Sequence, residues 1–217
     1  MPEIRQNSDL LVLTDARERW VVRGLQAILA AIMVYGLATG QLGMASNGAL
    51  TLSVTFVPAI LQRTYGYSMD VGLVLWLTIA VVLHSVGALG PYRDYSWYDN
   101  ITHTVSASLI AGVGYAVLRA LEVHSDEIDV PKAFRGLFIV VFVLAMGIVW
   151  ELVEFASVVV SDMVGARAPL IVFGIDDIIT DLLFNTAGAV VVALWGTESF
   201  RGLASFFRRR LRRSRGR

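Results

Sequence analysis

The chain has 217 residues, of which 56% are hydrophobic and only 17% charged. Soluble domains average roughly 45–50% apolar and 25% charged residues, so this composition excludes a disordered, collagen-like or nucleic-acid-binding chain and indicates a membrane protein. The formal net charge is zero, and the absence of cysteine excludes disulfide scaffolds, cysteine-ligated zinc, iron–sulfur clusters and thiol catalysis.

Six apolar segments follow one another, each close to the roughly 20 residues that cross a bilayer as a helix. They cover residues 20–37, 44–61, 71–89, 100–121, 134–160 and 175–195. The second is the weakest, because it carries Asn47, several hydroxyl side chains and Pro58. No apolar stretch precedes the first segment, so we expect an uncleaved anchor. The connections are too short for a soluble domain.

Basic residues give the orientation of these segments, because Lys and Arg collect on the cytoplasmic side of membrane proteins. If both termini are cytoplasmic, Arg93 and Arg167 are the two of the 18 Lys and Arg residues that lie outside. We therefore predict an all-α, polytopic helix bundle in the cell membrane, with six transmembrane helices and both termini cytoplasmic. Its parts are a cytoplasmic segment (1–19), a transmembrane domain (20–196) and a basic cytoplasmic tail (197–217).

Two charged stretches lie on the predicted cytoplasmic side. The arginines of 208–217 are interpreted as a topology determinant that lies on anionic lipid headgroups. They do not indicate nucleic-acid binding, because no aromatic side chains or folded reader accompany them. The acidic stretch 122–129 is interpreted as a solvated turn, which Pro131 ends.

Polar side chains interrupt the last four predicted spans. They are His84, Asp99, His103, Glu151, Glu154, Asp176, Asp177, Asp181 and Asn185. An ionisable group in a bilayer costs a few kcal/mol or more, so each must face the bundle interior. Residues three or four apart share one face of a helix. Such pairs occur in each of these spans except 71–89, which carries only His84. With a rise of 1.5 Å per residue, the predicted topology brings the groups together in the outer half of the membrane.

The paired glutamates are the strongest indication of a site. Two carboxylates on one buried helix face must be protonated, paired or bound to a cation. No buried Lys or Arg is expected to pair with them, because Arg93 and Arg167, the two predicted to lie outside, are in loops. We predict an outward-opening pocket in which a divalent cation (Mg²⁺, Mn²⁺ or Zn²⁺) is bound by His103, Glu151, Glu154, Asp177 and Asp181. Glu151 and Glu154 are also the candidate catalytic carboxylates, and His84, Asp99 and Asn185 are the predicted supporting residues. Alternatives are helix caps at Asp99 and Asp176, a structural His84, and a structural network of shared protons.

Four motifs between residues 84 and 194 resemble those of a known family. In chain order they are His84-x-x-Gly87, the Tyr-Asp-x-x-x-His stretch within 97–103, the aromatic-Glu-x-x-Glu-aromatic stretch at 150–155, and Asp177-x-x-x-Asp181 followed by Gly188. Together they are similar to the YjdF-like inner-membrane proteins, with a looser likeness to VanZ-like membrane proteins. The resemblance implies a multi-helix integral membrane protein and supplies no activity.

Three functions are compatible with these residues. The first is a metal-dependent enzyme that acts on a lipid or lipid-linked substrate at the outer leaflet. The second is a proton- or cation-coupled transporter. The polar residues argue against it, because they stop in the outer half of the membrane. The third is a non-catalytic assembly partner, for which Gly36-x-x-x-Gly40 offers a packing surface toward another protein or within the bundle. The protein partner and the substrate are not identified by the sequence.

Overall fold

The computed structural model describes residues 15–124, 130–163, 165, 167–170, 174–196 and 200–215. This part of the chain consists of helices without strands, which confirms the all-α prediction. The elements are α1 (Asp15–Ala38), α2 (Leu42–Val54), α3 (Val57–Tyr65), α4 (Val71–Gly87), α5 (Pro91–Asp94), α6 (Ser96–His124), α7 (Lys132–Met163), α8 (Ile175–Val191), the π-helical turn η1 (Val192–Gly196) and α9 (Arg201–Arg215).

Five helical stretches of the described chain are long and apolar enough to cross a membrane. They are Ala16–Ala38, Leu42–Tyr65, Ser96–Val123, Lys132–Met163 and Ile175–Leu194. The remaining predicted span, residues 71–89, corresponds to α4, which has 17 residues, the lower limit of the usual range. The chain is therefore a multi-pass membrane protein, while the count of six crossings and the cytoplasmic termini stay predictions.

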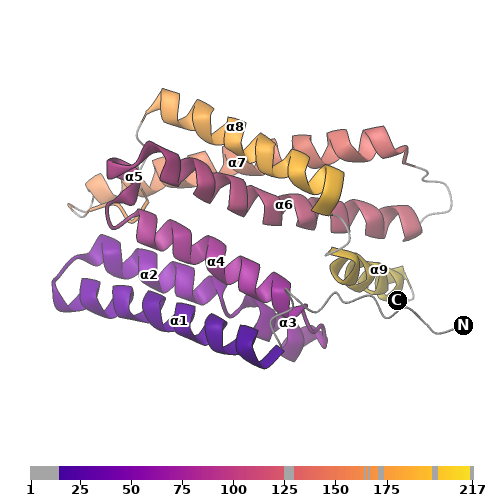
Figure 1. Ribbon diagram of the computed structural model, residues 1–217, viewed down its shortest axis with the longest axis horizontal. Coiled ribbons are helices and arrows are strands. Elements are labelled where there is room, and N and C mark those ends of the chain that lie inside the picture. The colour runs from indigo at the N-terminus through magenta and orange to yellow at the C-terminus, as the bar shows by residue number, and fades with distance from the viewer. Residues whose placement is uncertain are drawn as a thin grey trace, which may run out of the picture.

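The long helices form two layers, with α1, α2 and α4 in one and α6, α7 and α8 in the other (Figure 1). Helix α6 is central, because it packs on α4, α7, α8 and α9. Helices α1 and α2 pack on each other and on α4. The four spans that carry the polar residues are therefore joined through α6, and α1 and α2 pack against α4.

Small residues allow α6 and α8 to approach closely. A Cβ atom added at Gly188 of α8 would lie 2.5 Å from the Thr104 carbonyl oxygen of α6. The Thr104 hydroxyl donates a 3.3 Å hydrogen bond to the carbonyl of Phe184 across the same interface. Close backbone approach with cross-helix hydrogen bonds is how helices associate in lipid, where no hydrophobic force joins them. Gly36 plays the same part between α1 and α2, since its Cβ would lie 2.5 Å from the Ala45 nitrogen.

The polar residues of the weakest predicted span have partners inside the protein. The buried Asn47 amide donates to the carbonyl of Pro169 at 3.1 Å and its oxygen accepts from Ser85 of α4 at 2.9 Å. The hydroxyls of Thr51 and Ser53 donate to carbonyls four residues earlier in α2. A segment with its polar groups satisfied in this way can cross a bilayer. Pro58 stands in the first turn of α3, where proline is tolerated because its missing N–H would have no partner there. The interruption of the helical stretch falls before it, at residues 55–56 between α2 and α3.

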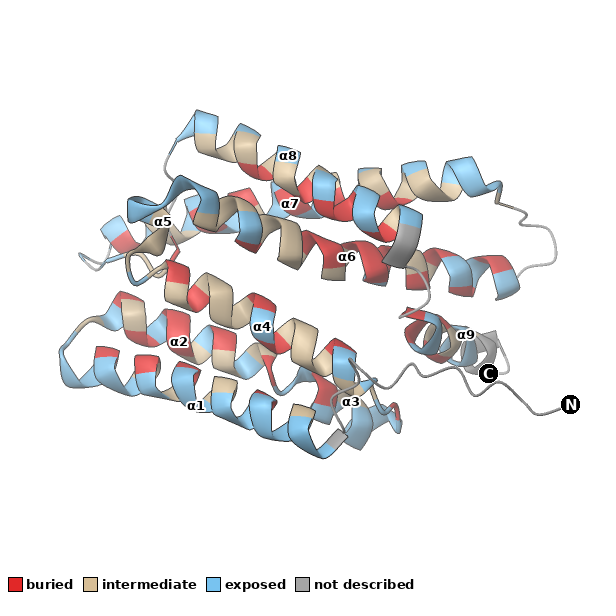
Figure 2. Cartoon of the chain, viewed as in Figure 1, coloured by how far each residue is buried: buried red, intermediate tan, exposed pale blue. Residues whose placement is uncertain are grey.

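The basic C-terminal segment packs against the bundle as a helix. The buried residues of this part are Phe200, Leu203, Ala204 and Phe206, and they join the same apolar core as Tyr67 of the first layer. Figure 2 shows this buried face of α9 beside α6. The described arginines 208–210 are exposed. The tail predicted at 197–217 thus contributes these side chains to the core, ahead of the arginines that are predicted to lie on lipid headgroups.

The interpretation of 122–129 as a solvated turn is wrong at its first residue. Helix α6 continues to His124, and the Glu122 carboxylate is buried. Arg135 of α7 donates to it at 2.8 Å and Arg119 at 3.0 Å. Two guanidiniums thus compensate one buried charge and tie α6 to α7, which the sequence pattern did not reveal. Residues 125–129 lie outside the described part.

Candidate metal site

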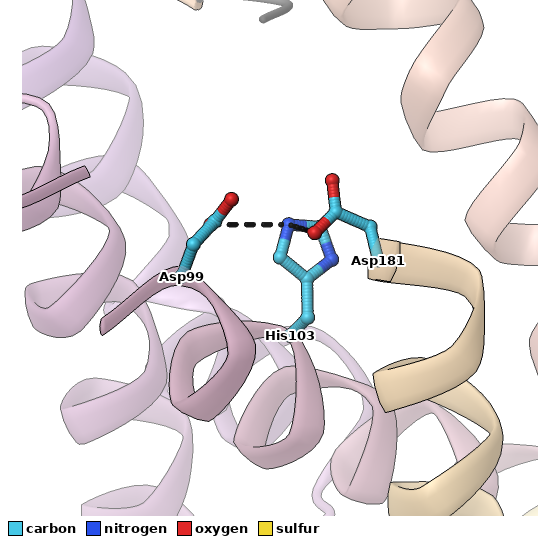
Figure 3. A group of neighbouring side chains, drawn as sticks. All are labelled: Asp99, His103 and Asp181. Atoms are coloured by element: carbon cyan, nitrogen blue, oxygen red, sulfur yellow. Dashed lines mark ion pairs between the residues drawn. The ribbon is translucent and has the colours of Figure 1, made fainter. Parts of the chain in front are cut away.

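Three potential ligands converge between α6 and α8 (Figure 3). The Nε2 atom of His103 lies 3.5 Å from an oxygen of Asp99 and 3.5 Å from an oxygen of Asp181. One donor atom from each residue lies within 4.8 Å of the other two. Both His–Asp distances exceed the usual 2.7–3.2 Å of an N–H···O hydrogen bond. The three groups are therefore arranged around a shared point instead of forming short hydrogen bonds with each other.

The helices place these side chains by simple spacing. Asp99 and His103 are four residues apart and share one face of α6, as the sequence predicts. Asp181 comes from the middle of α8, seven residues before the Gly188 contact that holds the two helices together. The close α6–α8 packing therefore sets the distance across the site.

A cavity of about 10 Å³ lies at the centre of the group. It is lined by His84, Tyr92, Asp99, His103, Glu154, Asp177 and Asp181. This is about the volume that one water molecule needs, so a single ion or water fits and a substrate does not.

Buried polar atoms without hydrogen-bond partners gather at this end of the bundle. Among the described residues they include Nε2 of His84, Oε1 of Glu151 and Oδ1 of Asp181. Such atoms are rare in folded proteins and indicate an ordered water, an ion or strain. His84 and Asp181 line the small cavity, where an ion would satisfy their atoms.

Tyr92 of α5 orients His84 of α4. Its hydroxyl lies 3.0 Å from Nδ1 of His84, and the Trp150 ring meets the imidazole edge-on at 5.2 Å. Burial raises the pKa of the Tyr92 phenol, so the phenol stays protonated. Its ring also occupies the place where a side chain at Gly87 would be, which explains the glycine three residues after the histidine. Tyr92 is not among the site residues predicted from the sequence. Its one indication there is Gly87, three residues after His84, which leaves room for the Tyr92 ring.

The predicted site residues fall into two groups in the structure. His103 and Asp181 lie within ligand distance of each other together with Asp99, which was predicted only to support the site. Glu154 and Asp177 line the same cavity, as does His84. Glu151 and Asn185 are both buried but do not line the cavity. Asp176 is exposed at the start of α8.

A family model described as a predicted membrane protein, DUF2238, matches residues 21–202. The chain belongs to this family. The match covers both layers of the bundle and all the residues of the site, and the likeness to YjdF-like proteins is consistent with it. Searches of the curated proteins and of the solved structures found no significant match.

Proposed function

We propose that this DUF2238 protein binds a divalent cation between Asp99, His103 and Asp181 and uses it to act on a lipid or lipid-linked substrate from the outer side of the membrane. The observation that carries the proposal is the convergence of three ligand atoms within 4.8 Å, beside a cavity the size of one ion. The Asp181 oxygen in this group is buried and has no hydrogen-bond partner among the described residues, which agrees with an ion at this place.

Charge compensation favours a cation over a purely structural network. The cavity is lined by four carboxylates and two histidines, and no Lys or Arg lines it. Like charges this close cannot all ionise in a low-dielectric interior unless a cation or shared protons compensate them. A divalent ion compensates most completely, since it is the largest local charge. One imidazole with two carboxylates suits Zn²⁺ or Mn²⁺ better than Mg²⁺.

Glu154 is the best candidate for a catalytic base. It lines the cavity from α7, opposite to the α6 and α8 ligands, and does not belong to the three-residue ligand group. A bound cation lowers the pKa of its water, and a neighbouring carboxylate that is not a ligand can accept the proton. Glu151 has no equivalent place at the cavity, so the catalytic part falls to Glu154 alone.

Metal content of the purified chain tests the binding step. We expect wild-type protein, purified in detergent after growth with Zn²⁺ and Mn²⁺, to retain about one ion per chain, as measured by elemental mass spectrometry. Asp181→Asn should lose most of it, because one ligand oxygen becomes a weakly binding amide. Asp176→Asn, a matched change at an exposed position of the same helix, should retain it. Metal-free wild-type protein, or an Asp181→Asn variant with full metal content, would refute the site.

The stability of Glu154→Gln separates a metal centre from an over-charged structural network. The change removes one charge at nearly constant volume. If a cation is held there, the variant should bind metal more weakly and unfold at a lower temperature with metal present. If the carboxylates only repel each other, the variant should be more stable than wild type. A stabilised variant would make us abandon the metal site.

A further inference from the structure

A large cavity lies at the same end of the bundle as the metal site. Its volume is about 1020 Å³. Its walls come from the α1–α2 connection, the end of α4, α5 and the described residues that follow α7. This volume is at the upper end of the range for small-molecule sites, so the cavity has room for a ligand much larger than an ion.

Both arginines predicted to lie outside, Arg93 and Arg167, line this cavity. No ion pair or side-chain hydrogen bond joins either guanidinium to another described residue. By contrast, Arg119 and Arg135 share Glu122, and Arg210 lies over the Tyr65 ring. Asp162 lines the same cavity but lies outside ion-pair distance of both arginines, so the cavity has an excess of one positive charge.

The remaining walls are amphiphilic. The apolar side chains are Ile32, Leu42, Met44, Leu89 and Pro169. The polar ones include Asn47 and Ser85, which bond to each other and are buried. A ligand that matches both kinds of wall has an apolar part and an anionic group.

We propose that this cavity binds an amphiphile with a phosphate group, held by Arg93 and Arg167. A guanidinium recognises oxyanions with two parallel hydrogen bonds. A phosphate monoester has three free oxygens, so it can accept a pair of parallel hydrogen bonds from each of two guanidiniums, whereas a carboxylate shared by two guanidiniums, as Glu122 is, accepts a single bond from each. The apolar wall then receives the hydrocarbon part, which selects a lipid over free phosphate.

Adjacent residues divide this cavity from the metal site. On α4, His84 lines the small cavity and Ser85 the large one; on α5, Tyr92 lines the small cavity and Arg93 the large one. A phosphate held by Arg93 thus lies next to the wall of the metal site. Lipid binding does not require the cation, but the identification of this lipid as the substrate rests on the function proposed above.

Lipid binding by the purified full chain tests the proposal. The probes are dioleoyl phosphatidate, dioleoylglycerol as its phosphate-free match, and inorganic phosphate, with binding counted by native mass spectrometry in detergent. We expect wild type to bind phosphatidate at least tenfold more tightly than either other probe. Replacing both Arg93 and Arg167 by Gln should weaken phosphatidate binding at least tenfold. Arg63→Gln, a change at an unpaired, exposed arginine at the other end of the bundle, should not.

Each other result has a definite meaning. Equal binding of phosphatidate by the Arg93, Arg167 double variant and wild type would overturn the proposal, as would equal binding of dioleoylglycerol. Equal binding of inorganic phosphate would make the cavity a free-phosphate site and also overturn it. Both arginines are exposed, so folding of the double variant is expected and is checked by its elution volume. Asp181→Asn should keep phosphatidate binding while losing metal, which separates failure here from failure of the metal site.

Discussion

Replacing Gly188 by Ala should damage the fold and the metal site together. The added Cβ would lie 2.5 Å from the Thr104 carbonyl oxygen, and 3.1 Å from both the Ala107 Cβ and the Ser108 nitrogen. Two of these neighbours are backbone atoms of α6, which cannot rotate away as a side chain can. Since carbon contacts are most favourable near 3.5–4.0 Å, α8 must move off α6 by about 0.5–1 Å.

Overpacking of this kind destabilises a protein by about 1–3 kcal/mol. The displacement also acts on Asp181, roughly 10 Å away along α8 at 1.5 Å per residue. Asp181 already lies 3.5 Å from His103, so further separation should weaken a shared ion. We therefore expect a lower unfolding temperature and a reduced metal content from one methyl group that touches no ligand.

Gly24→Ala is the matched control for this experiment. Its Cβ would meet nothing within 4 Å, and it stands within α1. Alanine is favoured over glycine in a helix by about 0.5–1 kcal/mol, so this variant should equal or exceed the wild type in stability. Thermal unfolding in detergent, followed by size-exclusion chromatography, compares the two variants. If Gly188→Ala is as stable as Gly24→Ala and keeps its metal, the α6–α8 contact at Gly188 does not determine the geometry of the metal site.

Two further predictions concern the end of the bundle that is predicted to be cytoplasmic. Glu122→Gln should lower the free energy of unfolding by about 1–3 kcal/mol, because it weakens charged hydrogen bonds from Arg119 and Arg135; chemical denaturation measures this, and an unchanged midpoint would contradict the buried ion-pair assignment. A reporter fused after Arg217 should read as cytoplasmic, because 16 of the 18 basic residues then lie on that side. Activity of an extracytoplasmic reporter at that position would reverse the assignment of the metal site to the outer half.

Helix existence could be predicted here, but not helix contacts. Apolar runs long enough to span a bilayer locate all the long helices, and four-residue spacing places Asp99 and His103 on one face. Which faces meet depends on how each helix is rotated, and the decisive contacts are between residues far apart in sequence. Glu151 and Glu154 are therefore equivalent in the sequence, yet only Glu154 lines the cavity.

Short polar connections carry still less information. Tyr92 reaches the site because Gly87 leaves room for its ring, a fact that appears only once α4 and α5 are packed. Likewise, the pattern of the C-terminal arginines predicts attraction to lipid headgroups but not the pocket that receives Phe200. In both cases the sequence shows the side-chain chemistry, and the tertiary structure decides where it acts.

The position of α9 has a consequence for how the molecule is made. Phe206 stacks on Tyr67 at 4.5 Å, and Phe200 lies against Trp76 at 5.9 Å and over Gly112. These partners belong to both layers and leave the ribosome well before α9, since synthesis runs from the N-terminus. The end of the bundle that α9 covers therefore stays open until α9 has been made. A transcript that ends early would leave a protein with its spans inserted and this end of its core exposed.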